Sequence, residues 1–322
     1  MIITRTPLRI SFTGGGTDLS DYYRINGGAV VSMAINKYIY VTVNRKFDNN
    51  IRVSYSQTEN VTEVDELHHE LVREAMRMAE ISGGVEVTSI ADIPAGTGLG
   101  SSSAFTVGVL NALYTYRGKR LSGRQLAQRA CEIEIDLLGH PIGKQDQYAA
   151  AHGGLNYFQF NADESVSYQR IVLSDDDWHN MNRRLMLFYT GITRSADGVL
   201  AEQKKNTAAK LDSLDDMKRQ ADRMCQELTE HGFNAHFGEA LHQGWMKKRE
   251  LAGAITNPTI SALYEKALAA GALGGKLLGA GGGGFLLFYC EEQNQPAVRG
   301  ALGLRQIDFA PDFYGSRVIY FA

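Results

Sequence analysis

Apolar stretches in the first half of the chain predict several strands and one clear amphipathic helix. Residues 2–12, 29–35, 37–46 and 51–56 are rich in β-branched and aromatic side chains, which is typical of strands. From Asp65 to Ile81 the apolar residues recur every three or four positions, which predicts a helix with one buried face. The residues of this apolar stripe are Leu67, Leu71, Val72, Ala75, Met76 and Ala79.

The rest of the chain mixes strands and helices without a regular alternation. Helical patterns cover 101–116, 122–138 and 144–152, and a long helical stretch follows at 199–254. The remaining expected elements are strands at 85–90, 184–189, 274–278, 285–290 and 315–322 and a helix at 258–270. Because no βαβα repeat is present, the pattern favours an α+β fold over a doubly wound sheet.

Length and composition narrow the class of protein. A chain of 322 residues is long enough for two domains, which we expect at 1–180 and 181–322. A net charge of −3, with Lys and Arg dispersed along the chain, argues against a nucleic-acid partner. Cys131, Cys225 and Cys290 are far apart and fit neither a disulfide framework nor a zinc site. Without a membrane-length apolar run or signal-peptide features, we expect a cytoplasmic protein that does not bind membranes.

The stretch GTGLGSSSA, Gly96 to Ala104, is the first candidate for chemistry. It stands between an expected strand and an expected helix, where glycines let the backbone approach an anion and the helix N-terminus offers free N–H groups. A turn with one capping serine is the alternative, but three glycines and three serines exceed that need. No Lys follows the last glycine, so the loop is not a Walker A motif. We therefore expect a phosphate-binding loop.

Two further glycine clusters flank this one in the chain. GAGGGG, from Gly279 to Gly284, matches a dinucleotide-binding spacing, but an expected strand follows it rather than a helix. A close approach of the backbone to a ligand is favoured over a simple hairpin loop. TGGGTD, from Thr13 to Asp18, ends in a carboxylate that can accept hydrogen bonds from polyol hydroxyls. Taken alone, Asp18 is more simply explained by an Asx-turn.

Two carboxylates between the expected helices could serve phosphoryl transfer. Asp146, in GKQDQ, could accept the proton of an attacking hydroxyl, although a surface aspartate paired with Lys144 is as good an explanation. In CEIEIDLLG, Glu132 and Asp136 are helical neighbours whereas Glu134 faces elsewhere. A carboxylate on that more apolar face could hold a metal ion.

Together these motifs resemble the GHMP kinase family of sugar and mevalonate kinases. PAGTGLGSSSA resembles its ATP-phosphate loop, TPLRISFTGGGTD its first motif and KLLGAGGGGF its third, and the resemblance spans almost the whole chain. It implies two α+β domains with the active site in the cleft between them. Further stretches, including GKQDQYAAAHGGLNYFQF and LFYTGITRSA, are similar to the branch that transfers the ATP γ-phosphate to the anomeric hydroxyl of a heptose 7-phosphate.

The resemblance assigns roles to individual residues. It implies that Asp146 acts as base or orienter of the attacking hydroxyl, with Arg9 as its cation, and that Ser102 and Glu134 bind Mg²⁺. The ATP phosphates are expected against Pro94, Gly96, Gly98, Leu99, Gly100, Ser101, Ser102 and Ser103. The substrate is expected against Gly15, Gly16, Thr17, Asp18, Gly281, Gly282 and Gly283. From charge and position alone, Arg194 and Lys276 are candidates for a distal phosphate.

One departure from the family bears on the substrate. The first motif reads GGGTD where many members carry G-E-H-x-D, which argues against galactokinase. A free-sugar 1-kinase of the fucose or uronate type therefore stands as an alternative, as does a non-catalytic sugar or nucleotide sensor on the same fold. The expected partner is a small-molecule substrate; the oligomeric state is open, with a homodimer as one option.

Overall fold

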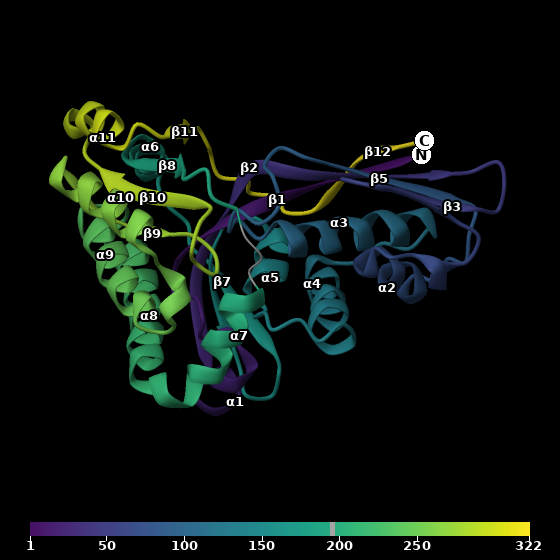
Figure 1. The fold of residues 1–322 in the computed structure, drawn as a ribbon, viewed down its shortest axis with the longest axis horizontal. Coiled ribbons are helices and arrows are strands. Elements are labelled where there is room, and N and C mark those ends of the chain that lie inside the picture. The colour runs from purple at the N-terminus through teal and green to yellow at the C-terminus, as the bar shows by residue number, and fades with distance from the viewer. Residues whose placement is uncertain (194–196) are drawn as a thin grey trace.

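The computed structural model describes residues 1–193 and 197–322, and its larger sheet has eight strands. Its main path runs β12-β1-β2-β5-β3-β4, while β6 pairs with both β2 and β7. These strands are β1 (Ile2–Thr13), β2 (Gly28–Arg45), β3 (Ile51–Ser54), β4 (Thr58–Val61), β5 (Val85–Ala91), β6 (Leu155–Phe160), β7 (Val166–Arg170) and β12 (Arg317–Phe321). Figure 1 shows β1 and β2 running through the middle of the molecule.

A smaller sheet forms within the second half of the chain, in the order β11-β8-β10-β9. Its strands are β8 (Leu185–Tyr189), β9 (Ala272–Leu277), β10 (Phe285–Cys290) and β11 (Arg305–Ile307). A second apolar core, which includes Phe188, Trp245, Tyr264 and Phe288, is buried around this sheet. The predicted α+β class is confirmed by this combination of separate helices with sheets that are antiparallel except where β3 pairs with β5.

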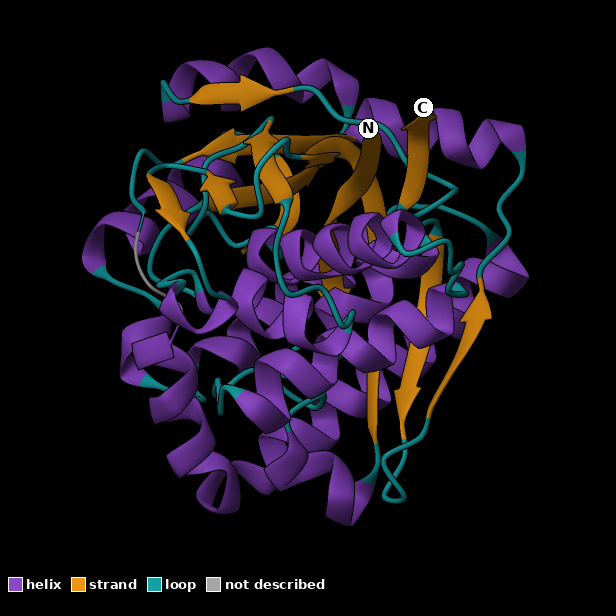
Figure 2. Ribbon diagram, turned by 90° about the vertical axis from the view of Figure 1, so that its right-hand side faces the viewer, coloured by secondary structure: helices purple, strands orange, loops and turns teal. Residues whose placement is uncertain are grey.

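Helices cover both sheets, as Figure 2 shows by the helices that lie across the strands. In the first half these are α1 (Ser20–Asn26), α2 (Glu70–Met78), α3 (Ser101–Tyr116), α4 (Gly123–Cys131), α5 (Gln145–His152) and α6 (Asp175–Arg184). In the second half they are α7 (Asp197–Asn206), α8 (Leu211–His231), α9 (His236–Arg249), α10 (Pro258–Ala269) and α11 (Gln295–Leu302). Helix α3 packs against β1 and β2, and α9 and α10 pack against β9. In the described part of the chain, no helix has the length and apolar character of a membrane span.

Three sequence expectations about elements differ from the structure. The two strands expected at 29–35 and 37–46 are one strand, β2, because β1 pairs with both parts, from Val31 to Val43. The pairing passes residues 36 and 37 by a register shift between Pro7 and Leu8. The helix expected from Asp65 begins only at Glu70, after a short 3₁₀ turn. The long helical stretch at 199–254 is divided among α7, α8 and α9.

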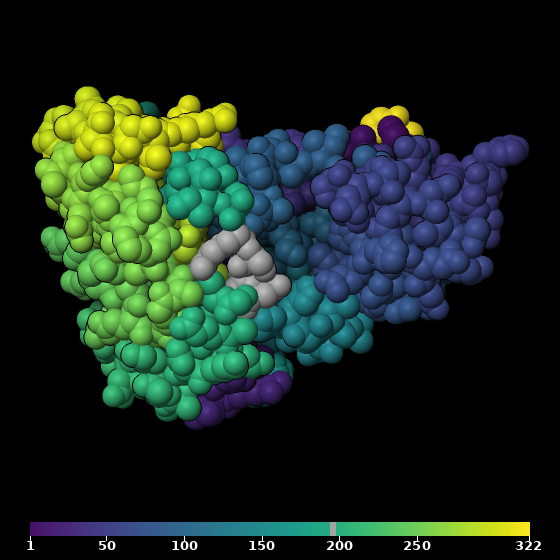
Figure 3. All heavy atoms as spheres, viewed as in Figure 1, coloured from purple at the N-terminus to yellow at the C-terminus, as the bar shows by residue number. Residues whose placement is uncertain are grey.

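The two ends of the chain meet in the larger sheet. Strand β12 pairs with β1, and the amino group of Met1 donates to the carbonyl of Ala322 at 2.6 Å (Figure 1). The domain boundary between residues 180 and 181 remains a prediction. The last strand, β12, belongs to the sheet of the first half although it comes from the second half of the chain. Between the two parts the surface is hollowed, as Figure 3 shows.

Candidate active site

The three glycine stretches converge on one cavity of about 770 Å³. The first follows β1, the second precedes α3, and the third connects β9 to β10. Gly98, at φ +83°, has no room for a side chain, since a Cβ there would lie 2.4 Å from the carbonyl oxygen of Leu278. The second and third glycine stretches are therefore in direct backbone contact across the cavity wall.

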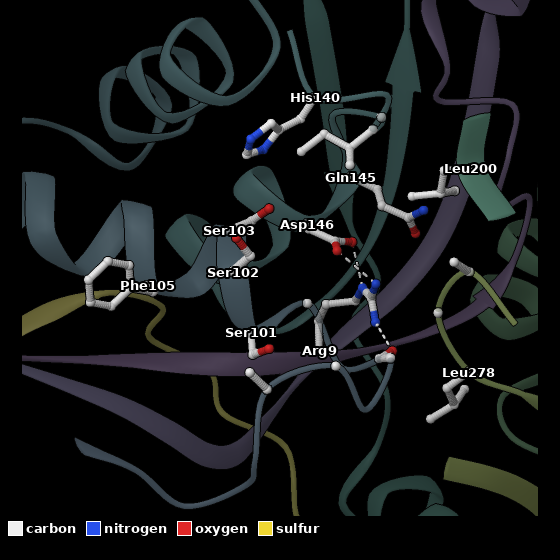
Figure 4. Close-up of a pocket in the computed structure, with 18 of the residues that line it drawn as sticks. Arg9, Ser101, Ser102, Ser103, Phe105, His140, Gln145, Asp146, Leu200 and Leu278 are labelled. Atoms are coloured by element: carbon white, nitrogen blue, oxygen red, sulfur yellow. Dashed lines mark hydrogen bonds and ion pairs between the residues drawn. The ribbon is translucent and has the colours of Figure 1, made fainter. Parts of the chain in front are cut away.

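Arg9 and Asp146 form a two-point ion pair at the centre of this cavity (Figure 4). The Nε and Nη2 atoms of Arg9 donate to the two carboxylate oxygens of Asp146 at 2.7 and 2.8 Å. The Nη1 atom donates to the carbonyl of Gly98 at 2.7 Å. Strand β1, the phosphate loop and helix α5 are thus joined at one guanidinium, and this geometry fixes the orientation of the carboxylate.

Three serines begin helix α3 beside the ion pair. Ser101, Ser102 and Ser103 all line the cavity, where the first N–H groups of a helix have no intrahelical partner. The helix dipole adds partial positive charge at this end. Gly96, Gly98 and Gly100 also line the cavity, so this end of α3 can hold phosphate oxygens.

Pro94 and Leu99, the other two members of the predicted phosphate loop, form hydrogen bonds that hold the loop in place. The carbonyl of Pro94 accepts a hydrogen bond from the Thr97 hydroxyl at 2.9 Å. Leu99 is fully buried, and its carbonyl accepts the N–H of Arg9 at 3.0 Å. Both residues lie outside the described cavity lining, so they shape the loop rather than face a ligand.

Glu134 lies behind the serines, on a π-helical turn that continues α4. Its carboxylate is fully buried and accepts hydrogen bonds from Ser102 Oγ at 3.3 Å, Thr106 Oγ1 at 3.1 Å and Gln147 Nε2 at 2.6 Å. Burial raises the pKa of Glu134 to about 7 despite these donors. Its neighbours Glu132 and Asp136 are exposed, in agreement with the sequence expectation that Glu134 faces elsewhere.

The pair of Ser102 and Glu134 fits a magnesium ion in its chemistry. Hydroxyl and carboxylate oxygens suit Mg²⁺, which is often held by one or two carboxylates plus the phosphates of its nucleotide. Within residues 1–193 and 197–322, no three His, Cys, Asp or Glu side chains are grouped so that they could hold a metal. A metal here would therefore depend on ligand phosphates.

Asp18 forms the other wall of the cavity. The carboxylate is buried and accepts the N–H groups of Gly16 at 3.0 Å and Gln145 at 3.2 Å. Burial raises the pKa of Asp18, and the charge of Asp146 raises it further. Gly15 and Gly16 also line the cavity, whereas Thr17 is buried and donates to the carbonyl of Gly14 at 2.8 Å. Thr17 thus stabilises the turn that carries Gly15, Gly16 and Asp18.

The predicted substrate positions in the second half are only partly brought together. Gly281 and Gly283 line the cavity, while Gly282 bonds to Ile255 through its N–H at 2.7 Å. For Lys276 the structure differs from the expectation of a distal-phosphate ligand. Lys276 lies outside the described cavity lining, and its buried Nζ donates to the carbonyl of Phe12 at 2.8 Å. Its side chain is held within the packed interior, so it does not reach a distal phosphate. Arg194 lies outside the described residues.

Sequence reasoning missed an aromatic group at one end of the cavity. Tyr55, His69 and Phe105 line it, and the His69 ring lies 4.6 Å from the ring of Tyr55 and 5.0 Å from that of Phe105. His69 is the residue directly before α2, which begins at Glu70. Burial lowers the pKa of His69, which favours an uncharged ring. In Figure 4 the pair of Arg9 and Asp146 lies between Phe105 on one side and Leu200 on the other.

Sequence reasoning also missed a buried lysine. Lys248, on α9, is 6% exposed, lines the cavity, and donates from Nζ to the carbonyl of Gly279. Burial, and then the charge of Arg9, lower the pKa of Lys248 to about 8, although Asp18 and Asp146 oppose this shift. A run of three basic residues at the end of α9 gave no sign of which one turns inward.

We expect the alkaline limb of the pH profile to depend on Lys248. The amine is charged below its pKa, so its attraction for phosphate oxygens is present at pH 7 and is lost as the pH rises through about 8. Lys248→Met should lower kcat/KM at pH 7 by about tenfold to a hundredfold and remove this limb. The matched control is Lys247→Met, because Lys247 is 45% exposed and pairs with Asp216. An alkaline limb that persists in Lys248→Met would contradict the assignment.

Comparisons with known proteins agree on one family. Residues 67–154 match the GHMP kinases N terminal domain, and residues 225–305 match the GHMP kinases C terminal domain. A D-glycero-alpha-D-manno-heptose 7-phosphate kinase of Campylobacter jejuni is 30% identical over 90% of this chain and 89% of its own length. An L-fucokinase/L-fucose-1-P guanylyltransferase of Bacteroides fragilis is also 30% identical, over 92% of this chain but 35% of that protein.

A solved structure gives the same result for the fold. A D-glycero-D-manno-heptose 1-phosphate kinase from Bacteroides thetaiotaomicron superposes with a TM-score of 0.83, at 25% identity, over 100% of both chains. The names of the two heptose kinases differ in the position of the phosphate that the substrate already carries. An activity test must therefore include both the heptose 7-phosphate and the heptose 1-phosphate as acceptors.

Proposed function

This chain belongs to the GHMP kinase family, and we propose that it transfers the γ-phosphate of ATP to the C1 hydroxyl of D-glycero-D-manno-heptose 7-phosphate. The family makes it an ATP-dependent kinase, and its relatives favour a sugar phosphate as the acceptor. The product would be the 1,7-bisphosphate, a precursor for nucleotide-activated heptose.

One observation carries the catalytic part of the proposal: Asp146 is held by Arg9 next to the N-terminus of α3. Phosphoryl transfer needs an oriented acceptor hydroxyl and positive groups around the phosphoryl oxygens more than it needs covalent help. Asp146 can accept the hydroxyl proton, while Arg9, Lys248 and the first N–H groups of α3 are placed to stabilise negative charge. Asp18 would bind sugar hydroxyls on the opposite wall.

We assign the two ends of the cavity to the two substrates. The aromatic end, with Tyr55, His69 and Phe105, suits the flat base of ATP, and the serines of α3 suit its phosphates. The end with Asp18 and Gln145 suits the sugar. Ser102 and Glu134 would hold Mg²⁺, which when bound neutralises phosphate charge during transfer. Ser102 and Ser103 both interact with the Glu134 carboxylate, which favours them over Ser101, and of these two we propose Ser102 as the ligand.

A second candidate is a kinase that phosphorylates C1 of a free sugar. The fucokinase relative favours it, because its identity to this chain equals that of the heptose 7-phosphate kinase. The two functions differ in whether the substrate carries a distal phosphate. For that phosphate Arg194 remains our candidate.

The proposal is tested by ADP release with Mg-ATP and a panel of acceptors. The panel contains D-glycero-D-manno-heptose 7-phosphate, the heptose 1-phosphate, the free heptose, L-fucose and D-galactose. We expect the highest kcat/KM with the 7-phosphate. Preference for L-fucose would establish the second candidate, and preference for the 1-phosphate would reverse the site of transfer. Binding of ATP and sugar without turnover of any acceptor would point to a sensor.

A further inference from the structure

Three polar side-chain atoms at the sugar end of the cavity are buried without a hydrogen-bond partner among the described residues. They are Ser11 Oγ, Gln145 Oε1 and Gln203 Nε2. Ser11 is 5% exposed and Gln203 is 3% exposed, and all three residues line the cavity. A buried polar group without a hydrogen-bond partner is destabilising, so three in one wall suggest that a ligand completes their hydrogen bonds.

The three side chains come from separate elements and meet around Gly15 and Gly16. A Cβ on Gly15 would lie 3.6 Å from Ser11 Oγ and 3.7 Å from Gln145 Nε2. A Cβ on Gly16, at φ +108°, would lie only 2.3 Å from Gln203 Nε2. Gly16 must therefore lack a side chain for the Gln203 amide, which α7 carries, to reach this wall. Strand β1 supplies Ser11, and the first residue of α5 supplies Gln145.

The charge around these atoms indicates what they can bind. Asp18 accepts the backbone N–H groups of Gly16 and Gln145, so a carboxylate lies within the same wall. Asp146 adds a second carboxylate next to Gln145 (Figure 4). Arg9 balances the charge of Asp146, whereas Asp18 has no ion-pair partner among the described residues, so a phosphate or carboxylate group is disfavoured beside Asp18. Gln145 Oε1 accepts hydrogen bonds only. A hydroxyl group can donate to such acceptors and accept from Gln203 Nε2 at the same time.

We propose that Gln203, Gln145 and Ser11 form a subsite that binds neighbouring uncharged hydroxyl groups of the sugar, and that Gln203 is a specificity-determining residue. The inference rests on the proposed sugar kinase function. It adds that this end of the cavity binds uncharged hydroxyl groups of the substrate. The ring hydroxyls are held here, and the distal phosphate of the substrate is directed away from this wall. Sugars that lack one of the bound hydroxyls are poor substrates because they leave a buried amide unpaired.

The test compares Gln203→Leu with wild type, using heptose 7-phosphate and its monodeoxy analogues at C2, C3 and C4. We expect the KM for the sugar to rise about tenfold to a hundredfold, with the KM for ATP unchanged. One deoxy analogue should lose a similar factor with wild type but almost none with Gln203→Leu, which a merely structural role would not produce. Ser11→Ala removes only the hydroxyl oxygen and keeps the packing of the cavity wall. It should raise the KM for the sugar by a smaller factor than Gln203→Leu does.

Controls separate this inference from the proposed function. Lys205→Leu alters an exposed residue of the same helix and should leave every constant unchanged. If wild type turns over another sugar of the panel, the same variants are measured with that sugar and its deoxy analogues. The subsite is overturned if Gln203→Leu and Ser11→Ala both leave the sugar KM unchanged, or if no analogue loses its penalty in Gln203→Leu. It is also overturned if the KM for ATP rises as much as that for the sugar.

Discussion

Asp146→Asn is expected to lower kcat by about a thousandfold or more, since it removes the group that we propose as acceptor of the hydroxyl proton and breaks one of two bonds to Arg9. The affinity for ATP should change little, because we assign the nucleotide to the α3 N-terminus and the aromatic end of the cavity. Steady-state kinetics give kcat, and titration calorimetry with ATP gives the affinity.

A matched control for this variant is Asp136→Asn, which changes an exposed aspartate on the preceding π-helical turn. It should leave kcat and the unfolding midpoint unchanged. If Asp146→Asn retains more than about a tenth of wild-type kcat, the carboxylate is not the proton acceptor. Loss of ATP affinity in the same proportion as kcat would instead mean that the pair with Arg9 only shapes the phosphate loop.

Glu134→Gln is expected to reduce activity and yet stabilise the ligand-free protein. In the folded state the pKa of Glu134 is raised to about 7, above its unfolded value, so the folded state binds more protons between these values. Stability therefore falls as the pH rises through this range, and the full penalty is present above pH 7. Replacement by the neutral amide should raise the free energy of unfolding by about 3 kcal/mol at pH 8 and by little at pH 5.

The loss of activity in Glu134→Gln would follow from the loss of a charged oxygen at the Mg²⁺ position. We expect kcat/KM for Mg-ATP to fall about a hundredfold. Urea unfolding at pH 5 and pH 8 measures the stability, and Glu132→Gln, an exposed neighbour, is the control. A destabilised Glu134→Gln variant with full activity would refute both the buried-charge penalty and the metal assignment.

Local sequence patterns could predict the parts of the site that are continuous in the chain. The proposed phosphate loop from Gly96 to Ser103 is one such part, since its glycines and serines would bind a ligand through their own backbone and hydroxyl groups. The fully buried position of Glu134 also follows from its offset from Glu132 and Asp136. Most of the longer strands and helices were predictable in the same way, whereas short elements such as α6 and α11 were not predicted.

Other parts depend on contacts between distant segments and could not be predicted. Lys248 and Gln203 are polar residues on helices, and only the packing of those helices on the glycine loops turns them toward the cavity. Lys276 shows the converse, because a lysine beside the third motif is held against Phe12. The continuity of β2 follows from its pairing with β1, β5 and β6, which no local pattern reveals.

The most direct test of the proposed function is the position of the new phosphate. Wild-type protein is incubated with Mg-ATP and D-glycero-D-manno-heptose 7-phosphate, and the product is followed by ³¹P NMR with correlation to the sugar protons. The account predicts a second phosphorus signal that is coupled to the anomeric proton, formed in step with ADP. A new phosphate on any other carbon, or no second sugar phosphate, would contradict it.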